Sequence, residues 1–199
     1  MKRAVWQGGW WLPARHVDSP NHDPRPHGQP IDLVVLHSIS LPPGEYGGDA
    51  VERLFTNRLD PSAHPYYEAL RGLRVSAHFY VRRSGRVLQF VDCGQRAWHA
   101  GVSVWRAQER CNDRSIGVEL EGLEGEAFEA AQYASLSLLL HALRRRYPIA
   151  EVVGHEHVAP GRKADPGSGF AWRRLGRALN WPTRASGPLL RLRTPHKPG

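Results

Sequence analysis

The segment at residues 152–167 constrains this chain more than any other, because it gathers reactive side chains where regular helix is opposed through most of its length. Its helix-breaking residues are Gly154, Pro160, Gly161, Pro166 and Gly167. Among them stand His155, His157, Lys163 and Asp165. Zinc accepts imidazole and carboxylate ligands, and a catalytic zinc site needs three protein ligands and one open position. A lone histidine is more often a surface or hydrogen-bonded residue, but this density favours a loop that supplies two ligands, with a third elsewhere.

Length and composition favour one globular domain. The chain has 199 residues and 41% hydrophobic content, which suits one sizeable core rather than two. No stretch approaches the roughly 20 apolar residues of a membrane span, and no apolar run follows Lys2 and Arg3. We therefore expect a cytoplasmic protein with no membrane association. Cys93 and Cys111 are too few for a disulfide scaffold and are expected to be reduced thiols.

The basic character of the chain comes almost wholly from arginine. The formal net charge is +8, and among 27 lysines and arginines only Lys2, Lys163 and Lys197 are lysines. A basic surface can attract nucleic acid, membrane or a small acidic ligand. The arginines are scattered without a nucleic-acid motif, so we expect a solvated face and no nucleic-acid partner. The same bias makes Lys163 conspicuous within its segment.

A buried strand is predicted directly before a further histidine. Residues 31–36 form a short apolar run rich in β-branched side chains, which is typical of a strand buried on both faces. His37 comes directly at its end, and ligands gather at the carboxyl ends of strands in open α/β sheets. His37 is therefore well placed to be the missing ligand.

Loops and a hairpin are predicted next. Residues 38–74 are loop-rich apart from a short helix at 49–55, with Asp49 as a possible cap, and should form a wall over a site or be mobile. Residues 75–81 and 87–91 predict a hairpin.

Two residues near this hairpin allow more than one interpretation. His78 would lie inside the first strand of the hairpin, where we favour a hydrogen-bonded core histidine. Trp98 stands among small residues and offers a flat apolar face. A sugar ring could lie on that face, although a packing role for the indole is about equally favoured.

Residues 115–122 alternate cleanly and predict a strand. The core-facing set is Ile116, Val118 and Leu120. The opposite face carries Glu119 and Glu121 and would be the wet side. On a surface strand these two carboxylates would be unremarkable, whereas in a central strand the same face would look into the metal site.

The remaining elements are read from caps and periodicity. Residues 126–147 predict the longest helix, with acidic side chains in its first turns and three arginines in its last. A short strand at 152–153 and a helix at 170–179 follow. Residues 1–30 are expected to be an irregular arm, and 183–199 a basic, proline-rich tail of low order.

These positions predict the parts of an amide hydrolase. The candidate ligands are His37, His155 and Asp165, with Glu119 and Lys163 as reacting groups. A metal lowers the pKa of the water it binds, a carboxylate can take the proton, and a lysine can stabilise the oxyanion formed at a carbonyl. The wide spacing of the ligands is not diagnostic by itself.

Seven short blocks, such as Arg96-Ala-Trp98-His99-Ala-Gly101, form a recognisable series along the chain; they lie at residues 34–48, 74–78, 96–101, 109–113, 115–122, 154–155 and 159–167. In these blocks the chain resembles the cytoplasmic 1,6-anhydro-N-acetylmuramyl-L-alanine amidases, within N-acetylmuramoyl-L-alanine amidase family 2. The resemblance implies an α/β fold of the peptidoglycan-recognition type, a single amidase domain at 1–182 with a central mixed sheet flanked by helices. The implied reaction cuts anhydro-muropeptides between the sugar and L-alanine in cytoplasmic peptidoglycan recycling, which limits β-lactamase induction. No obligate protein partner is implied.

The resemblance also assigns roles to residues. One zinc per chain would be bound by His37, His155 and Asp165, with Glu119 as the catalytic glutamate and Lys163 as the lysine that stabilises the transition state. The implied substrate-binding residues are Ser38, Arg74, Trp98 and Arg110, where the two arginines would hold peptide carboxylates. Ser38 replaces the family's asparagine, and His157 replaces an acidic residue, so His157 is not expected to be a ligand. The tail at 183–199 lies outside the resemblance.

Three other functions make different demands on the sequence. An inactive peptidoglycan-binding module of the same fold would lack a metal ligand or Glu119, and all are present. An exported amidase would carry a signal peptide or a lipid-attachment cysteine near its start, and neither pattern is seen. A nucleic-acid binder would lose affinity steeply with salt.

Overall fold

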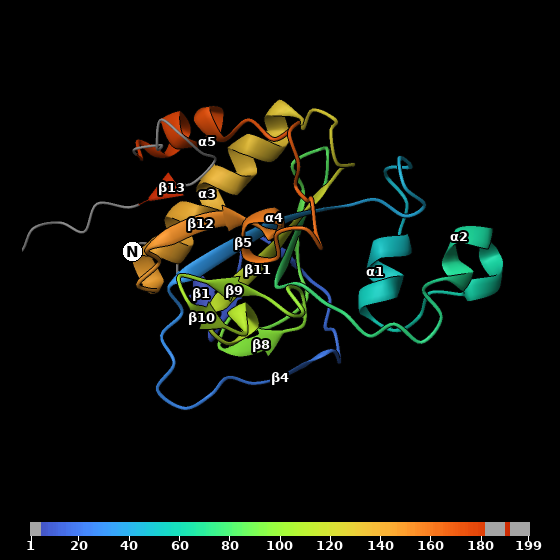
Figure 1. The fold of residues 1–199 in the computed structure, drawn as a ribbon, viewed down its shortest axis with the longest axis horizontal. Helices are drawn as coiled ribbons and strands as arrows, with labels where there is room; N and C mark the ends of the chain where they lie inside the picture. The colour runs from blue at the N-terminus through green and yellow to red at the C-terminus, as the bar shows by residue number, and fades with distance from the viewer. Residues whose placement is uncertain (1–4, 182–189, 192–199) are drawn as a thin grey trace, which may run out of the picture.

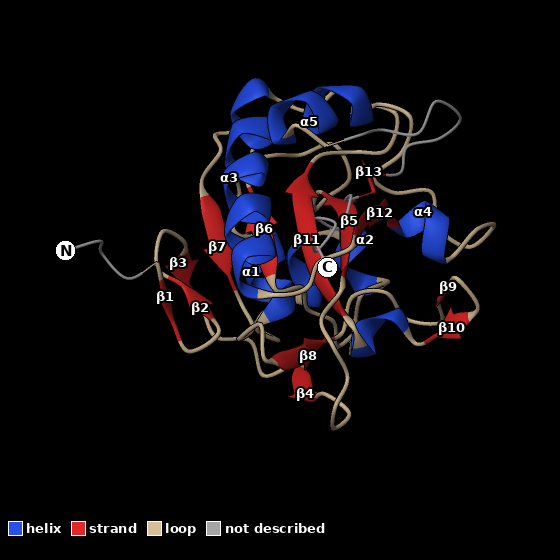
Figure 2. Cartoon of the chain, turned by 90° about the vertical axis from the view of Figure 1, so that its left-hand side faces the viewer, coloured by secondary structure: helices blue, strands red, loops and turns tan. Residues whose placement is uncertain are grey.

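A mixed β-sheet forms the centre of the molecule. The computed structural model describes residues 5–181 and 190–191. Within these residues, seven strands follow the order β13–β12–β5–β11–β6–β7–β3, and the middle of this order can be followed in Figure 2. Their bounds are Arg15–His16 for β3, Leu33–Ile39 for β5, Phe79–Val81 for β6, Val87–Gln89 for β7, Ser115–Glu121 for β11, Glu151–Gly154 for β12 and Leu190–Arg191 for β13. β12, β5, β11 and β6 run parallel, whereas β6 with β7 and β12 with β13 are antiparallel. The predicted fold class is confirmed.

β5 lies inside the sheet, between β12 and β11, and is buried on both faces, as predicted. Residues 33–36 have no exposed surface, because neighbouring elements cover both faces of a parallel strand. The strand is longer than predicted and continues through His37 to Ile39, since β11 pairs with it as far as Glu121. His37 therefore lies inside the strand rather than after its end.

The predicted hairpin is confirmed as β6 and β7, each shorter than the sequence suggested. β6 begins only at Phe79, so His78 precedes the strand rather than lying inside it. His78 is fully buried and its Nδ1 accepts a hydrogen bond from the backbone N–H of Gly117 at 3.0 Å. It is the hydrogen-bonded core histidine that was predicted.

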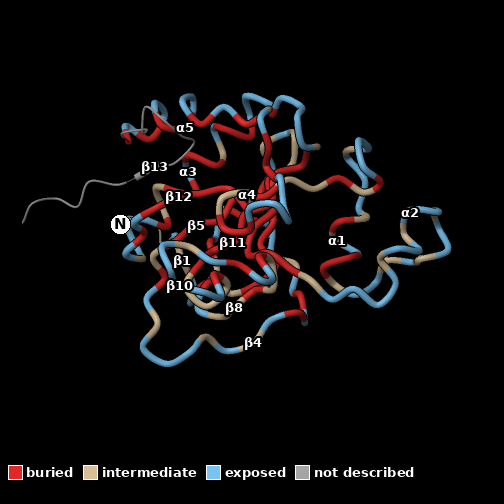
Figure 3. Tube along the Cα trace, viewed as in Figure 1, coloured by how far each residue is buried: buried red, intermediate tan, exposed pale blue. Residues whose placement is uncertain are grey.

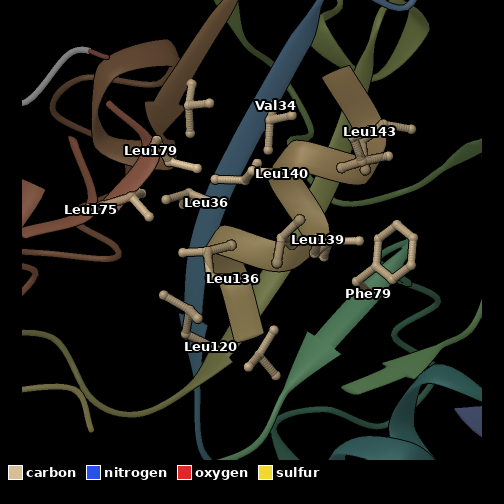
Figure 4. Close-up of a cluster of buried hydrophobic side chains, with 14 of the residues drawn as sticks. Val34, Leu36, Phe79, Leu120, Leu136, Leu139, Leu140, Leu143, Leu175 and Leu179 are labelled. Atoms are coloured by element: carbon tan, nitrogen blue, oxygen red, sulfur yellow. The ribbon is translucent and has the colours of Figure 1, made fainter. Parts of the chain in front are cut away.

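Two helices cover one face of the sheet: α3 at Ala130–Arg146 and α5 at Trp172–Leu179. Figure 4 labels the side chains that meet there, Val34, Leu36, Phe79, Leu120, Leu136, Leu139, Leu140, Leu143, Leu175 and Leu179. Both helices begin later than predicted. α3 begins at Ala130 because Glu129 is its N-cap, and the N–H of Glu129 donates to Oε1 of Gln132 at 2.9 Å.

The opposite face is covered by two parts of the chain: the long connection after β5 packs beside β6 and β7, whereas Ala100, Cys111 and Val158 pack against β5 and β12. The connection holds α1 at Ala50–Phe55, a 3₁₀ turn (η1) at Pro61–Ala63 and α2 at Pro65–Glu68. Figure 1 shows α1 and α2 set apart from α3 and α5, and Figure 3 shows that α2 is far more exposed than the strands. Asp49 does stand at the N-cap of α1, but its carboxylate makes no capping bond and instead accepts from Nε of Arg53 at 2.9 Å.

The N-terminal arm is more ordered than the irregular segment that the sequence suggested. β1 at Trp6–Gln7 pairs with β2 at Trp10–Trp11, β3 extends the central sheet, and β4 at His22–Pro24 pairs with β8 at Gln95–Ala97. The Gln89 side chain holds this arm, because it accepts from the N–H of Trp11 and donates to the carbonyl of Gly9. Strands of two or three residues are too short to show a period in the sequence.

The remaining elements are β9 at Val104–Trp105, β10 at Gln108–Glu109, a 3₁₀ turn (η2) at Cys111–Asp113 and α4 at His155–Val158. Cys93 and Cys111 are both free thiols, as expected, and both are buried. Among the described residues, no helix combines the length and apolarity that crossing a bilayer requires. Of the predicted tail, residues 183–189 and 192–199 lie outside the described residues, whereas the backbone of 190–191 pairs with β12.

Candidate metal centre and substrate cleft

Three side chains, one from β5 and two from the segment that follows its neighbour β12, converge on one point. His37 belongs to β5, His155 is the first residue of α4 directly after β12, and Asp165 lies in the loop that follows. The Nδ1 atoms of His37 and His155 are 3.0 Å apart, and Oδ2 of Asp165 lies 3.0 Å and 3.1 Å from them. All three side chains are buried. The structure therefore brings together the three predicted ligands, because β12 lies beside β5.

The two imidazoles are held by their outward-facing nitrogens. Nε2 of His155 lies 3.0 Å from the carbonyl oxygen of Ala100, to which it can only donate. Nε2 of His37 lies 2.9 Å from Nδ1 of His99. Burial lowers the pKa of His37 to about 4, so this ring is neutral at neutral pH. A neutral ring that donates from Nε2 presents the lone pair of Nδ1 to the centre.

The charges at this point suit a divalent cation. Burial alone would raise the pKa of Asp165, but hydrogen bonds with His155 and His37 outweigh it and hold that pKa well below its usual range. A carboxylate oxygen and two imidazole nitrogens thus face one another at about the separation that a shared ion requires. His37, His155 and Asp165 form a group that could hold a metal, with ligand atoms all within 4.8 Å of one another.

Glu119 faces this group from β11. It stands opposite His37 in the register of β11 with β5. Its side chain is buried, and its Oε2 has no hydrogen-bond partner among the described residues. Burial, together with the charge of Asp165, raises the pKa of Glu119 well above its usual value, and the charge of Lys163 offsets only part of this. A buried carboxylate with a raised pKa and a free oxygen is suited to take a proton.

The alternation predicted for β11 is confirmed, but its second face is not wet. Val118 and its apolar neighbours join the core beneath α3, while Glu119 and Glu121 are buried as well. Glu121 does not serve the cleft, because its carboxylate accepts from the backbone N–H groups of Gly47 and Arg83 at 2.6 Å and 2.9 Å. Only one of the two carboxylates reaches the candidate centre.

A cleft of about 290 Å³ opens over the three ligands. Its lining includes Ser38, Trp98, Glu119 and Lys163, together with apolar residues from the connection between β5 and β6. Lys163 is exposed at this cleft, whereas the hydroxyl of Ser38 is buried and has no partner among the described residues. Four of the predicted catalytic and substrate-binding residues therefore share one cavity with the candidate ligands.

The two predicted carboxylate-binding arginines lie outside this cleft. Arg74 lines an adjoining hollow of about 170 Å³, which shares Leu54, Leu70 and Leu73 with the cleft. Arg110 lines a different hollow, and its Nε lies 3.1 Å from Oδ2 of Asp113. The structure thus places Arg74 beside the cleft and does not bring Arg110 into it.

Sequence reasoning missed the support beneath the ligands. His99 belongs to a motif block but has no predicted role in holding a ligand, yet its Nδ1 lies 2.9 Å from Nε2 of His37. His157 is not in the metal group, because its Nδ1 accepts from the N–H of Gly154 at 2.7 Å. The sequence offered one general indication, which is that the second nitrogen of a ligand imidazole needs a hydrogen-bond partner. It did not single out His99, because several histidines could have been that partner.

Known proteins share this fold and about half of this sequence. A profile of the N-acetylmuramoyl-L-alanine amidase family matches residues 27–168. The 1,6-anhydro-N-acetylmuramyl-L-alanine amidase AmpD of Citrobacter freundii is 50% identical over 177 residues, 88% of this chain and 94% of that protein. A crystal structure of a selenomethionine derivative of AmpD matches with a TM-score of 0.84 and 47% identity, covering 88% of this chain and 99% of that one. E. coli AmiD, in complex with its substrate anhydro-N-acetylmuramic acid-L-Ala-D-γ-Glu-L-Lys, gives a TM-score of 0.58 and 31% identity over 79% of this chain and 62% of that one.

Proposed function

The chain belongs to the N-acetylmuramoyl-L-alanine amidase family, and we propose that this amidase uses one zinc ion to hydrolyse the amide bond between 1,6-anhydro-N-acetylmuramic acid and L-alanine. The observation that carries the proposal is the convergence of two Nδ1 atoms and one carboxylate oxygen at 3.0–3.1 Å beside an unpaired glutamate oxygen. The substrate follows from the relatives, since AmpD is named for this amide and AmiD was solved with an anhydro-muramyl peptide.

His37, His155 and Asp165 would hold the zinc. When bound, the ion supplies a Lewis acid that polarises the scissile carbonyl and acidifies water. Glu119 accepts the proton of the attacking water, for which its buried and unpaired Oε2 is well suited. The same carboxyl group can then return that proton to the leaving amine of L-alanine.

Lys163 stabilises the negative charge that develops on the carbonyl oxygen. It lines the cleft together with Glu119 and the ligands. Its positive charge acts to lower the pKa of Glu119 and of His37, although burial has the larger effect on both groups. A compact ammonium at that position suits an oxyanion, because it places a full charge where the charge develops.

The remaining residues bind substrate. Trp98 offers its flat face to the sugar, and the unpaired hydroxyl of Ser38 supplies a hydrogen bond to the peptide. Arg74, beside the cleft, holds a carboxylate of the stem peptide. A substrate role for Arg110, which lies outside the cleft, rests on the family motif alone. We place the reaction in the cytoplasm, in the recycling of cell-wall fragments that would otherwise induce β-lactamase; this part rests on the motif blocks shared with the family.

One experiment tests the chemistry. Protein of known zinc content is incubated with anhydro-muramyl tripeptide, and the products are identified by mass spectrometry. We expect free anhydro-N-acetylmuramic acid and intact tripeptide, with no product from Glu119→Gln or from chelated enzyme. Cleavage at another bond, or equal turnover by chelated enzyme, would contradict the proposal.

A further inference from the structure

Two consecutive residues hold the outer nitrogens of both candidate histidine ligands. Nδ1 of His99 lies 2.9 Å from Nε2 of His37, and the carbonyl of Ala100 lies 3.0 Å from Nε2 of His155. An imidazole that binds a metal almost always donates its other N–H to a fixed partner, and that partner sets both the tautomer and the ring orientation. The His99–Ala100 dipeptide supplies that partner twice.

The dipeptide is itself held from behind. The backbone N–H of Ala100 donates to Oδ1 of Asn112 at 2.8 Å. Nε2 of His99 lies 3.1 Å from the hydroxyl of Ser115, the first residue of β11, which has no exposed surface. A hydroxyl can accept from His99 Nε2–H, which leaves His99 Nδ1 as an acceptor. In this arrangement Nε2–H of His37 donates to Nδ1 of His99, and Nδ1 of His37 keeps its lone pair toward the candidate metal centre.

The space for the His99 ring exists only because position 117 is glycine. A Cβ on Gly117 would stand 2.4 Å from Cγ of His99, closer than two such atoms can approach. The backbone conformation does not itself require glycine at position 117, because the φ of Gly117 is not in the left-handed region. Its lack of a side chain therefore fits the need of the His99 ring to lie against β11.

We propose that His99 is a positioning residue of the metal centre, which orients the ring of His37 so that its Nδ1 lone pair faces the cation, with Gly117 making room for it. The inference rests on the proposed zinc site. It assigns His99 no proton transfer to the substrate. It predicts that His99 contributes to metal affinity and coordination geometry even in the absence of substrate.

The test measures zinc affinity by competition with a chelator, and the visible absorption of the cobalt-substituted enzyme. His99→Leu leaves Nε2–H of His37 buried without a partner and should weaken zinc binding about 10- to 100-fold. Gly117→Ala displaces the same ring without altering its chemistry and should weaken binding in the same direction. His99→Asn retains an acceptor close to the position of Nδ1 and should recover most of the affinity. The cobalt absorption of the first two variants should shift.

His78→Leu is the matched control. His78 is another wholly buried histidine, with its ring centroid 5.9 Å from that of His99, but it has no contact with a ligand. The substitution His78→Leu should lower the thermal midpoint of the metal-free protein and leave its zinc affinity unchanged. Unchanged affinity in both His99→Leu and Gly117→Ala, or an equal loss in His78→Leu, would overturn the inference while the proposed function stands. Absence of zinc binding by the native protein would overturn both.

Discussion

Replacing Glu119 by glutamine should lower activity and raise stability at the same time. The native side chain is 8% exposed, and its Oε2 has no hydrogen-bond partner among the described residues. The enzyme therefore maintains a carboxyl group in a place that disfavours its charged form. Glutamine has nearly the same shape and cannot accept the proton of water, so it removes the proposed general base without leaving a cavity.

Both magnitudes follow from the surroundings of Glu119. Loss of a positioned general base costs roughly 10²–10⁴ in kcat, or about 3–5 kcal/mol in the activation barrier. An unsatisfied buried polar group costs about 1–3 kcal/mol, more when it is charged. A buried neutral amide removes part of that cost, so we expect a gain of about 1 kcal/mol in the free energy of unfolding. For a chain of 199 residues this corresponds to roughly 2–4 °C in the melting temperature.

The stability gain of Glu119→Gln should depend on pH in a definite direction. Burial raises the pKa of Glu119 above its ordinary 4.5, so between the unfolded and folded values the native state binds more protons than the unfolded state. Its stability therefore falls as the pH rises through that window, and the variant lacks this loss. The difference between variant and native enzyme should grow as the pH rises above 4.5.

The assay compares kcat with the melting temperature of the metal-free proteins across pH, since a bound cation would favour the charged carboxylate. Zinc content of the loaded proteins is measured in parallel and should be equal. Loss of stability together with activity would show that Glu119 is a structural residue. Near-native turnover with zinc bound would show that another group takes the proton of the attacking water.

Three further results are expected. Asp165→Ala should abolish zinc binding in metal analysis, whereas His157→Ala should retain it because His157 Nδ1 is occupied by the N–H of Gly154; full occupancy in both would refute the ligand assignment. Lys163→Arg should lose much of kcat with little change in KM or zinc content, since the ammonium acts as charge develops; native kcat in this variant and in Lys163→Ala would remove it from the mechanism. Burial holds the pKa of His78 well below its ordinary 6.5, so the unfolded state binds the extra proton and stability in urea should fall as the pH drops below 6.5; an equal fall in His78→Asn would contradict this.

The sequence determined by itself the elements with long or strongly marked patterns. The apolar run around Val34 is typical of a buried strand, the charged ends of residues 126–147 indicated a helix, and the alternation around Val118 indicated a strand. These patterns reflect local geometry, because side chains repeat every two residues in a strand and every 3.6 in a helix. The sequence also indicated which residues could be ligands, because the imidazole of His155 and the carboxylate of Asp165 can bind a metal wherever the loop lies.

Only the tertiary structure decided which of these residues meet. The parallel pairing of β12, β5 and β11 sets His37 between His155 and Glu119, and nothing in the local sequence fixes that order of strands. The same pairing carried β5 past its predicted end. The structure also gives Glu121 and Glu119 different roles, although both lie on the same face of β11. The carboxylate of Glu121 already accepts hydrogen bonds from backbone N–H groups of two loops. A buried carboxylate takes its role from the partners that the fold places beside it, and those partners are distant in the chain.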